Sequence, residues 1–346
     1  MIITRTPYRV SFFGGGTDFP AHYSEHGGAV ISSTINRYSY IHCRHLPPYF
    51  DHKYRIRYFQ TERVSSVADI QHPSVRECIR FLDYKYPLEI LHSGDIPAMS
   101  GIGSSSSFTV GLLMALYGLQ GRMVTKRELA EHAIHVEQER IVENVGSQDQ
   151  YAAAFGGLNR IDFGKGKRIS VSPIFISPND LSYLQDNLLF YFSGIARMSS
   201  EIQAEHKKNL PLIVSQLNEM HQMVDEAQHF LGQGKKGIDA FGSLLHEAWK
   251  LKKSFSKKVS TGVLDVIYKR AMDAGASGGK VCGAGGGGFM MFYVRPEYRE
   301  KVKEALKGML LIPIRLEYLG AHVVFYTHED STVYSESDAS WSSECL

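Results

Sequence analysis

Apolar positions along the chain follow two patterns, short continuous runs and a spacing of three to four residues, which predict a mixture of strands and helices. Strands are predicted near residues 8–13, 29–43, 88–92, 188–192, 289–294 and 323–326. Helices are predicted over 75–84, 106–120, 263–274 and 296–306, and over 199–231 with a break near Pro211. Thr125 and Glu128 have the spacing of a capping box, which predicts a helix from there towards Glu143. Residues 46–75 show no clear period and are assigned no element.

The order of these elements predicts an α+β protein. The C-terminal part alternates helices with strands in the manner of a split βαβ module. We place a domain boundary near residue 187, between an N-terminal domain over 1–187 and a helix-rich C-terminal domain over 188–330. The functional site is expected between the two domains. The Ser-rich segment 331–346 is predicted to be a flexible tail.

The composition is that of an ordinary globular protein, with 43% hydrophobic and 21% charged residues. A net charge of +2 gives no reason to expect a nucleic-acid partner or a membrane surface, and it suits a small anionic ligand. No apolar stretch approaches the roughly 20 residues needed to span a bilayer, and the first residues lack the apolar core of a signal peptide. The four cysteines show no metal-type spacing, so a reduced, cytoplasmic setting is expected.

A segment rich in Ser and Gly, residues 97–107, runs directly into a predicted apolar helix. Small residues let backbone N–H groups approach an oxyanion, and a helix N-terminus adds unpaired donors and partial positive charge. Clustered hydroxyls add hard ligands for magnesium. The segment lacks the Gly-Lys-Ser/Thr ending of a Walker loop, and the alternative, a plain linker, does not explain the helix that follows at once. The predicted phosphate-binding residues are Gly101, Gly103, Ser104, Ser105, Ser106 and Ser107.

Acidic residues between positions 137 and 150 form a second candidate. A helical carboxylate at Glu137, a turn at Gly146 and a loop carboxylate at Asp149 could supply a metal ligand and a general base. Alone this signal is weak, because acidic residues on helices are mostly solvated. Near the N-terminus Arg9 lies on a predicted strand, with a run of three glycines and Asp18 after it, and this pattern is equally typical of a surface strand and turn.

The glycine-rich segment 283–288 matches the Gly-x-Gly-x-x-Gly fingerprint of dinucleotide-binding proteins. That fingerprint requires a helix after the glycines. Residues 289–294 here predict a strand, so a nicotinamide-dependent enzyme is not the favoured interpretation. Five glycines in six residues instead predict a loop that other backbone or a ligand approaches closely.

Taken in order, these segments resemble the three sequence motifs of the GHMP kinases, the family of galactokinase and of homoserine, mevalonate and phosphomevalonate kinases. The resemblance extends over residues 4–326, and the order of the motifs makes it more specific than any one of them. Within the family the chain most resembles the bacterial D-glycero-D-manno-heptose 7-phosphate 1-kinases, through residues 9–18, 145–157, 193–197, 283–288 and 320–322. The resemblance implies an N-terminal domain of ribosomal-protein-S5-like type, a ferredoxin-like C-terminal domain, and a site in the cleft between them.

The resemblance also implies roles for individual residues. Asp149 falls at the catalytic aspartate and Arg9 at the basic residue beside it. Ser105 and Glu137 fall at the magnesium ligands, with Glu139 as the competing choice. The expected sugar-binding residues are Asp18, Gly16, Thr17, Arg197, Gly285 and Gly286. Arg197 follows a predicted strand and precedes a helix, so it is the first candidate for a phosphate on the sugar, although a structural pairing at the domain junction explains it equally well.

The activity implied by the resemblance is that of an ATP-dependent sugar 1-kinase that uses Mg²⁺. Its expected substrate is D-glycero-D-manno-heptose 7-phosphate, phosphorylated to the 1,7-bisphosphate for nucleotide-activated heptose used in capsule or lipopolysaccharide synthesis. Galactose is not expected, because Gly15-Gly16 stand where galactokinases have Glu-His. The alternatives are an L-fucose or N-acetylhexosamine 1-kinase and, from another class, a non-catalytic sugar- or nucleotide-binding protein. The adenine-binding residues and a homodimeric state are left open.

Overall fold

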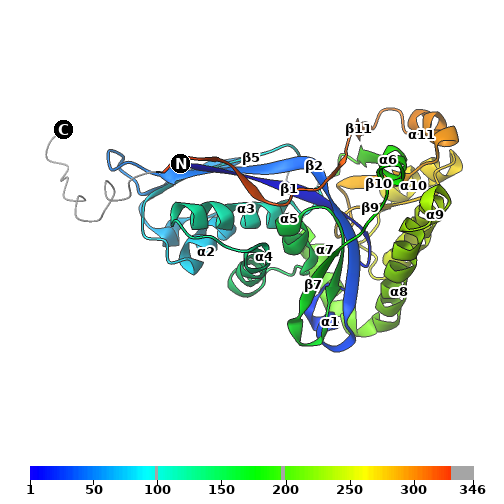
Figure 1. Ribbon diagram of the computed structural model, residues 1–346, viewed down its shortest axis with the longest axis horizontal. Helices are drawn as coiled ribbons and strands as arrows, with labels where there is room; N and C mark the ends of the chain where they lie inside the picture. Colours follow the sequence, from blue (N-terminus) through cyan, green and yellow to red (C-terminus); the bar gives the residue numbers. More distant parts are fainter. Residues whose placement is uncertain (98–99, 196–198, 329–346) are drawn as a thin grey trace.

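The computed structural model describes residues 1–97, 100–195 and 199–328 (Figure 1). The described part forms two β-sheets, and the helices pack against them. The predicted α+β class is therefore confirmed. None of the described helices combines the length and the apolar composition needed to cross a membrane.

The first sheet contains most of the strands and follows the order β13-β1-β2-β5-β3-β4, with β6, β7 and β12 joined to its side. Its long central pair, β1 and β2, is antiparallel and places Arg9 opposite Thr34. The strands are β1 (Ile2–Phe13), β2 (Gly28–His45), β3 (Tyr54–Arg57), β4 (Thr61–Val64), β5 (Leu88–Gly94), β6 (Leu158–Phe163), β7 (Ile169–Pro173), β12 (Leu316–Glu317) and β13 (His322–Tyr326). Strands β3 and β4 lie in the segment to which the apolar pattern assigned no element.

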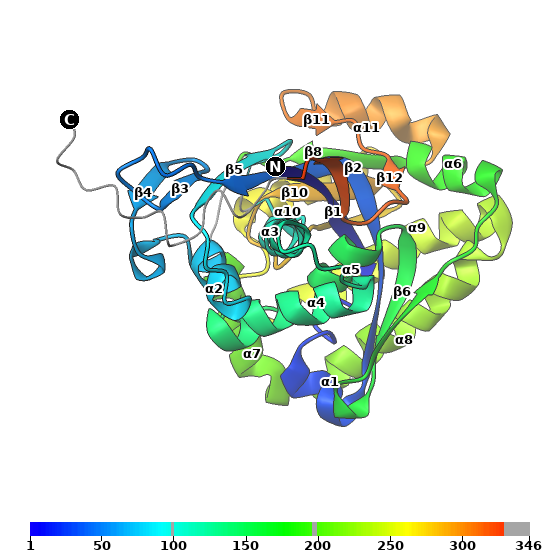
Figure 2. The ribbon, with the colours of Figure 1, turned by 60° about the vertical axis from the view of Figure 1, so that its left-hand side comes forward.

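Helices α2 to α5 gather along one face of this sheet (Figure 1), while α1 lies at its far end (Figure 2). Helix α3 is apolar almost all round and buried, because it packs on β1 and β2 and is covered by α2, α4 and α5. The helices of this part are α1 (Pro20–His26), α2 (Pro73–Phe81), α3 (Ser104–Leu119), α4 (Lys126–Ile134) and α5 (Gln148–Phe155). Short helical turns occur at η1 (Val67–Asp69), η2 (His135–Arg140) and η3 (Lys165–Lys167).

The second sheet is antiparallel and has the order β11-β8-β10-β9. Numbered by their place along the chain, its strands stand in the order 4-1-3-2, and helices connect the first to the second and the third to the fourth, as in a ferredoxin-like module. The strands are β8 (Leu188–Phe192), β9 (Gly278–Val281), β10 (Phe289–Tyr293) and β11 (Leu310–Ile312). The helical elements are α6 (Pro178–Asp186), α7 (Ser199–Asn209), η4 (Leu210–Leu212), α8 (Val214–Leu231), α9 (Gly234–Lys253), α10 (Gly262–Asp273), η5 (Pro296–Tyr298) and α11 (Arg299–Ala305).

The predicted C-terminal domain over 188–330 needs one correction. Strand β13 pairs with β1, and β12 pairs with β2, so the end of the described chain belongs to the first sheet. The predicted boundary near residue 187 falls just before β8, the first strand of the second sheet. The predicted tail, 331–346, lies outside the described residues.

One hydrophobic core joins the two sheets. It contains Phe12 and Phe13 of β1 together with Phe241 of α9 and Met291 of β10. The ring of Phe241 meets Phe12 and Phe13 edge-on, with centroids 5.4 and 5.0 Å apart. This shared core fixes the end of β1 against the second half of the molecule, and the candidate site lies beside it.

Candidate active site

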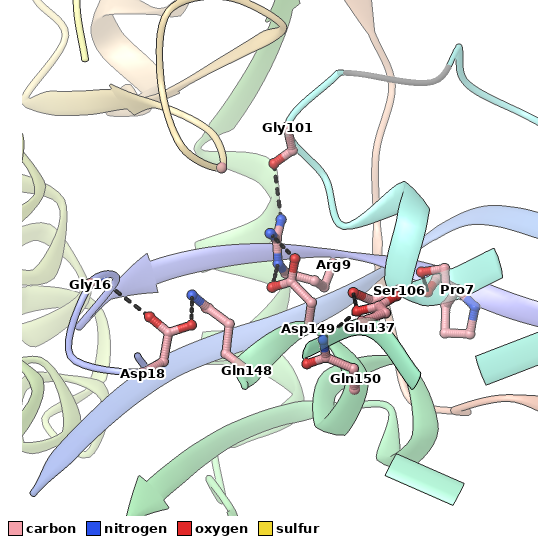
Figure 3. A network of polar contacts seen from close by, with 12 residues as sticks. Pro7, Arg9, Gly16, Asp18, Gly101, Ser106, Glu137, Gln148, Asp149 and Gln150 are labelled. Carbon is pink, nitrogen blue, oxygen red and sulfur yellow. Dashed lines mark hydrogen bonds and ion pairs between the residues drawn. The ribbon is translucent and has the colours of Figure 1, made fainter. Parts of the chain in front are cut away.

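The site is built around an ion pair between Arg9 on β1 and Asp149 in the first turn of α5 (Figure 3). The guanidinium donates from Nε and Nη2 to the two oxygens of the carboxylate, each at 2.6 Å. Its third nitrogen, Nη1, donates to the carbonyl of Gly101 at 2.9 Å. Arg9 is buried, whereas 21% of the Asp149 side chain is exposed. The fork therefore fixes the direction of a carboxylate that remains open to a ligand.

A second carboxylate, Asp18, lies in the same cleft. Its oxygens accept the backbone N–H of Gly16 at 2.9 Å and the side-chain amide of Gln148 at 3.0 Å. Burial, with the negative charge of Asp149 nearby, raises the pKa of Asp18. A Cβ on Gly146 would stand 1.9 Å from Asp18 Oδ2, so a larger residue in the turn before α5 would displace this carboxylate.

The predicted phosphate loop leads into the N-terminus of α3. Gly101 and Gly103 have φ values of +80° and +74°, and the helix starts at Ser104. Both glycines adopt the left-handed conformation that other residues rarely take. A Cβ on Gly101 would lie 2.6 Å from the carbonyl oxygen of Cys282, so this loop packs tightly against the start of the glycine-rich segment 283–288.

The serines of this loop differ in their surroundings. Ser104 is half-buried and Ser105 is exposed, whereas Ser106 and Ser107 are buried. Ser107 donates its hydroxyl to the carbonyl of Pro7 and its backbone N–H to the carbonyl of Gly103, each at 3.0 Å, so both of its donors are occupied and its side chain fixes α3 to β1. Ser106 donates its hydroxyl to Glu137 Oε2 at 2.8 Å.

Glu137 lies on η2, a short stretch of π-helix that continues α4. It is fully buried, and burial together with the neighbouring Glu143 raises the pKa of Glu137 to about 7. Hydrogen bonds from Ser106 and Gln150 hold Oε2 and oppose this rise. The other oxygen, Oε1, is buried and accepts no hydrogen bond from any described residue.

An unpaired carboxylate oxygen near clustered hydroxyls suits a hard cation such as Mg²⁺. Glu139, the competing choice, points the other way: its side chain is 59% exposed and pairs with His135 at 2.9 Å. The structure thus brings Glu137 to the phosphate loop and leaves Glu139 outside. It brings Ser106 to Glu137, while the exposed Ser105 makes no hydrogen bond to Glu137 within the described part of the chain.

The expected sugar-binding residues are only partly brought together. A cleft that is partly open to solvent is lined by Arg9, Asp149, Asp18 and Gly16 among others. Thr17 is a correction, because it is buried and its hydroxyl lies within hydrogen-bond distance of the Gly14 and Ala29 carbonyls, where it closes a turn.

The glycine-rich loop contacts the cleft less than expected. Gly283 and Ala284 line the cleft, but Gly285 and Gly286 do not. The Gly286 N–H donates to the Val259 carbonyl at 2.8 Å, and a Cβ on Gly285 would stand 2.5 Å from that carbonyl oxygen. These two glycines therefore permit a close approach of backbone to backbone. Arg197 lies outside the described residues.

Among the cleft residues that were not predicted from the sequence are two lysines, Lys252 and Lys280. Lys252 continues the buried stripe of α9 that includes Leu245, Ala248 and Trp249. A lysine at a position of the buried stripe is unusual, and this was the sequence feature that could have indicated a functional role. Lys280 lies in β9, whose four residues are all buried. With Arg9 they add positive charge to the cleft that contains Asp18 and Asp149.

Backbone donors at a helix N-terminus, a fixed carboxylate and a cationic cleft together define a phosphotransferase site for a small molecule. Residues 73–157 match the N-terminal domain of the GHMP kinases, and residues 226–310 match their C-terminal domain. The chain belongs to the GHMP kinases, and it is an ATP-dependent enzyme that phosphorylates a hydroxyl group. The predicted family and fold are confirmed.

Individual relatives narrow the comparison. A protein from Campylobacter jejuni called D-glycero-alpha-D-manno-heptose 7-phosphate kinase is 33% identical over 319 residues, which cover 88% of this chain and 93% of that protein. A crystal structure titled as a D-glycero-D-manno-heptose 1-phosphate kinase from Bacteroides thetaiotaomicron has a TM-score of 0.77 at 25% identity and covers 95% of this chain and 100% of its own. A putative sugar kinase from Campylobacter jejuni has a TM-score of 0.72 at 26% identity, covering 93% and 97%.

Proposed function

We propose that this protein transfers the terminal phosphoryl group of ATP to the anomeric hydroxyl of D-glycero-D-manno-heptose 7-phosphate. The observation that carries the proposal is the fixed Arg9–Asp149 pair, which lies in a cleft with Asp18 and touches the phosphate loop at Gly101. The 33% identical relative, named as a heptose 7-phosphate kinase, supports this choice of substrate.

In this mechanism the backbone N–H groups around Gly103 and the N-terminus of α3 bind the ATP phosphates. Asp149 has lone pairs beyond those that Arg9 occupies, and it accepts the hydrogen bond of the sugar hydroxyl. The hydroxyl oxygen bonds to the terminal phosphorus, its proton passes to Asp149, and the bond from that phosphorus to ADP breaks. Arg9 keeps the carboxylate of Asp149 in position and offsets negative charge on the transferring group. Asp18 accepts hydrogen bonds from hydroxyls of the sugar.

Magnesium fits the residues around Glu137, because Oε1 is unpaired and buried. Glu137 and Ser105 would hold the ion, and Ser106 would orient the carboxylate through Oε2. When bound, Mg²⁺ neutralises charge on the phosphate oxygens.

A product assay tests the proposal. The purified protein is incubated with ATP, Mg²⁺ and a panel of phosphorylated and free heptoses and hexoses, and products are identified by mass and phosphorus NMR. We expect heptose 7-phosphate to give the 1,7-bisphosphate with the highest kcat/KM of the panel. A higher kcat/KM for L-fucose or an N-acetylhexosamine would replace the proposed substrate, and an absence of product from every sugar would remove the sugar-kinase proposal.

A further inference from the structure

Two buried lysines form the cleft wall that the second half of the chain contributes. Lys252 lies in the last turn of α9 and Lys280 in β9, with exposed fractions of only 8% and 5%. Both line the cleft that contains Arg9, Asp18 and Asp149. Neither is needed by the chemistry described above.

Each ammonium group has donors to spare. Lys252 Nζ donates to the carbonyl of Gly283, and Lys280 Nζ donates to the carbonyl of Phe12 at 2.9 Å. An ammonium carries three N–H donors, and in the described part of the chain neither lysine has a carboxylate within ion-pair distance. Burial lowers the pKa of Lys252 to about 8 and the pKa of Lys280 well below its usual value.

Two unpaired cations close together are costly to bury, typically by several kcal/mol for each ion. They repel each other, and each repels Arg9 as well. An anion that enters the cleft would supply the missing partner. The arrangement therefore points to a ligand and does not serve the stability of the empty fold.

The lysines reach beyond the reacting end of the cleft. Arg9 contacts the phosphate loop, while Lys280 binds the carbonyl of Phe12, three residues further along β1. Three residues of extended strand span about 10 Å. Lys252 lines the same cleft, and its Nζ donates to the carbonyl of Gly283, at the start of the glycine-rich loop. Positive charge in the cleft is thus not confined to Arg9 beside the phosphate loop.

We propose that Lys252 and Lys280 bind the phosphate group that the acceptor sugar carries at the end distant from its reacting hydroxyl. This inference rests on the proposed function in that the acceptor is taken to be a sugar phosphate. A phosphate monoester carries close to two negative charges at neutral pH, which two ammonium groups offset. The sugar is then held at both ends, at its hydroxyl by Asp149 and at its phosphate by the lysine pair.

The test uses Lys252→Met and Lys280→Met, which keep most of the side-chain length and remove the charge. The matched control is Lys250→Met, an exposed lysine on the same helix. We expect the KM for heptose 7-phosphate to rise tenfold or more in each cleft variant, and the KM for ATP to change less than about threefold. The control should match the parent. Thermal melting checks the fold, and neither cleft variant should melt below the parent, because an unpaired buried charge is removed.

A charge-retaining variant, Lys252→Arg, should recover part of the lost affinity for the acceptor.

The outcomes separate this inference from the proposed function. If the parent phosphorylates heptose 7-phosphate and the lysine variants keep its KM, the inference is wrong and the function stands. An equal rise in the KM for ATP also overturns the inference, since the lysines would then serve the transferred group. If the parent prefers a hexose phosphate and the variants lose it, the substrate changes and the inference stands. A parent that phosphorylates only free sugars overturns both.

Discussion

Asp149 differs from an ordinary surface carboxylate because one guanidinium holds both of its oxygens. Arg9 donates to each oxygen at 2.6 Å and is itself tied to the Gly101 carbonyl. The direction of the carboxylate is therefore set before substrate binds, and the same arginine connects it to the phosphate loop. Such preorganisation makes the charge of Asp149, more than its shape, the property that catalysis needs.

Asp149→Asn should keep the shape and remove the charge. We expect kcat to fall by about 10²–10⁴, the usual scale of general acid–base catalysis, while the affinity for ATP stays within a few-fold of the parent. Steady-state kinetics and ATP titration measure the two effects. Activity within a few-fold of the parent would remove Asp149 from the mechanism.

Glu137 and Glu139 are two residues apart but face different surroundings, one buried beside Ser106 and the other paired with His135 at the surface. Glu137→Gln should raise the magnesium concentration needed for half-maximal activity about tenfold or more, because a neutral amide replaces a hard anionic ligand. Glu139→Gln, the control, should leave that concentration unchanged. The reverse pattern in magnesium titrations would assign the ion to Glu139.

Because the pKa of Glu137 is raised, the affinity for magnesium should depend on pH. Burial raises that pKa from its ordinary value near 4.5 to about 7, so below pH 7 most of the metal-free protein carries a proton on the carboxyl. A metal ligand must lose that proton, so the apparent affinity for magnesium should increase as the pH rises from 6 to 8. The terminal phosphate of ATP titrates in the same range, so the readout is the difference between the parent and Glu137→Gln. Parallel pH curves for the two proteins would contradict the assignment.

At the scale of elements, the two glycine-containing loops form one unit. Gly101, with φ of +80°, leaves no room for a Cβ, which would stand 2.6 Å from the Cys282 carbonyl. Gly121 has a similar φ of +66°, but no atom lies within 4 Å of its Cβ position. Alanine at Gly121 would carry only the conformational cost of a left-handed residue. Alanine at Gly101 would carry that cost and also the cost of forcing the two loops apart.

Gly121→Ala should lower the free energy of unfolding by about 1–2 kcal/mol, the cost of a left-handed alanine. Gly101→Ala should lower it further and should also raise the KM for ATP, because the phosphate loop must move away from Cys282. Urea denaturation and steady-state kinetics provide the two measurements. Equal loss of stability in both variants, with an unchanged KM for ATP, would show that the loops do not depend on this close approach.

Local sequence signals predicted most elements, and their failures have physical causes. The capping box at Thr125 and Glu128 forms as expected, since both of its hydrogen bonds are local. The helix after it does not continue regularly to Glu143, because it changes to a π-helix at His135–Arg140, where Glu137 turns towards Ser106 and Gln150. Tertiary contacts of this kind leave no periodic mark in the sequence.

The residues of the candidate site, like the helices and strands, were predicted only in part. Arg9, Asp149, Asp18 and Glu137 were identified through the order of the motifs, and the structure brings them to one region, as Figure 3 shows. The hydroxyls of Thr17 and Ser107 are bonded to backbone carbonyls, which the motif does not reveal. Lys252 and Lys280 were missed, because they come from separate elements and meet in the cleft only through the packing of the second sheet.

The two halves of the molecule are joined more closely than their order along the chain suggests. Strands β12 and β13 return from the second half to the first sheet, and one core runs through both halves. Arg9 and Phe12 lie on the same strand, β1, so packing at its end bears on the position of the catalytic pair. The two halves should therefore unfold together, in contrast to domains joined only by a linker.

Phe241→Ala tests this coupling, since its ring contacts Phe12 and Phe13 across the junction at 5.4 and 5.0 Å. We expect the free energy of unfolding to fall by about 3–5 kcal/mol, the usual cost of removing a buried phenyl ring. The parent and the variant should each unfold in one urea transition, with the same midpoint by circular dichroism and by tryptophan fluorescence. Phe241→Ala should also lose kcat, because β1 carries Arg9 as well as both phenylalanines.

The control is Val266→Ala, at a position 60% exposed on α10, which should change stability by less than about 0.5 kcal/mol. Two separate transitions in Phe241→Ala, with the catalytic rate unchanged, would show that the shared core does not support the site.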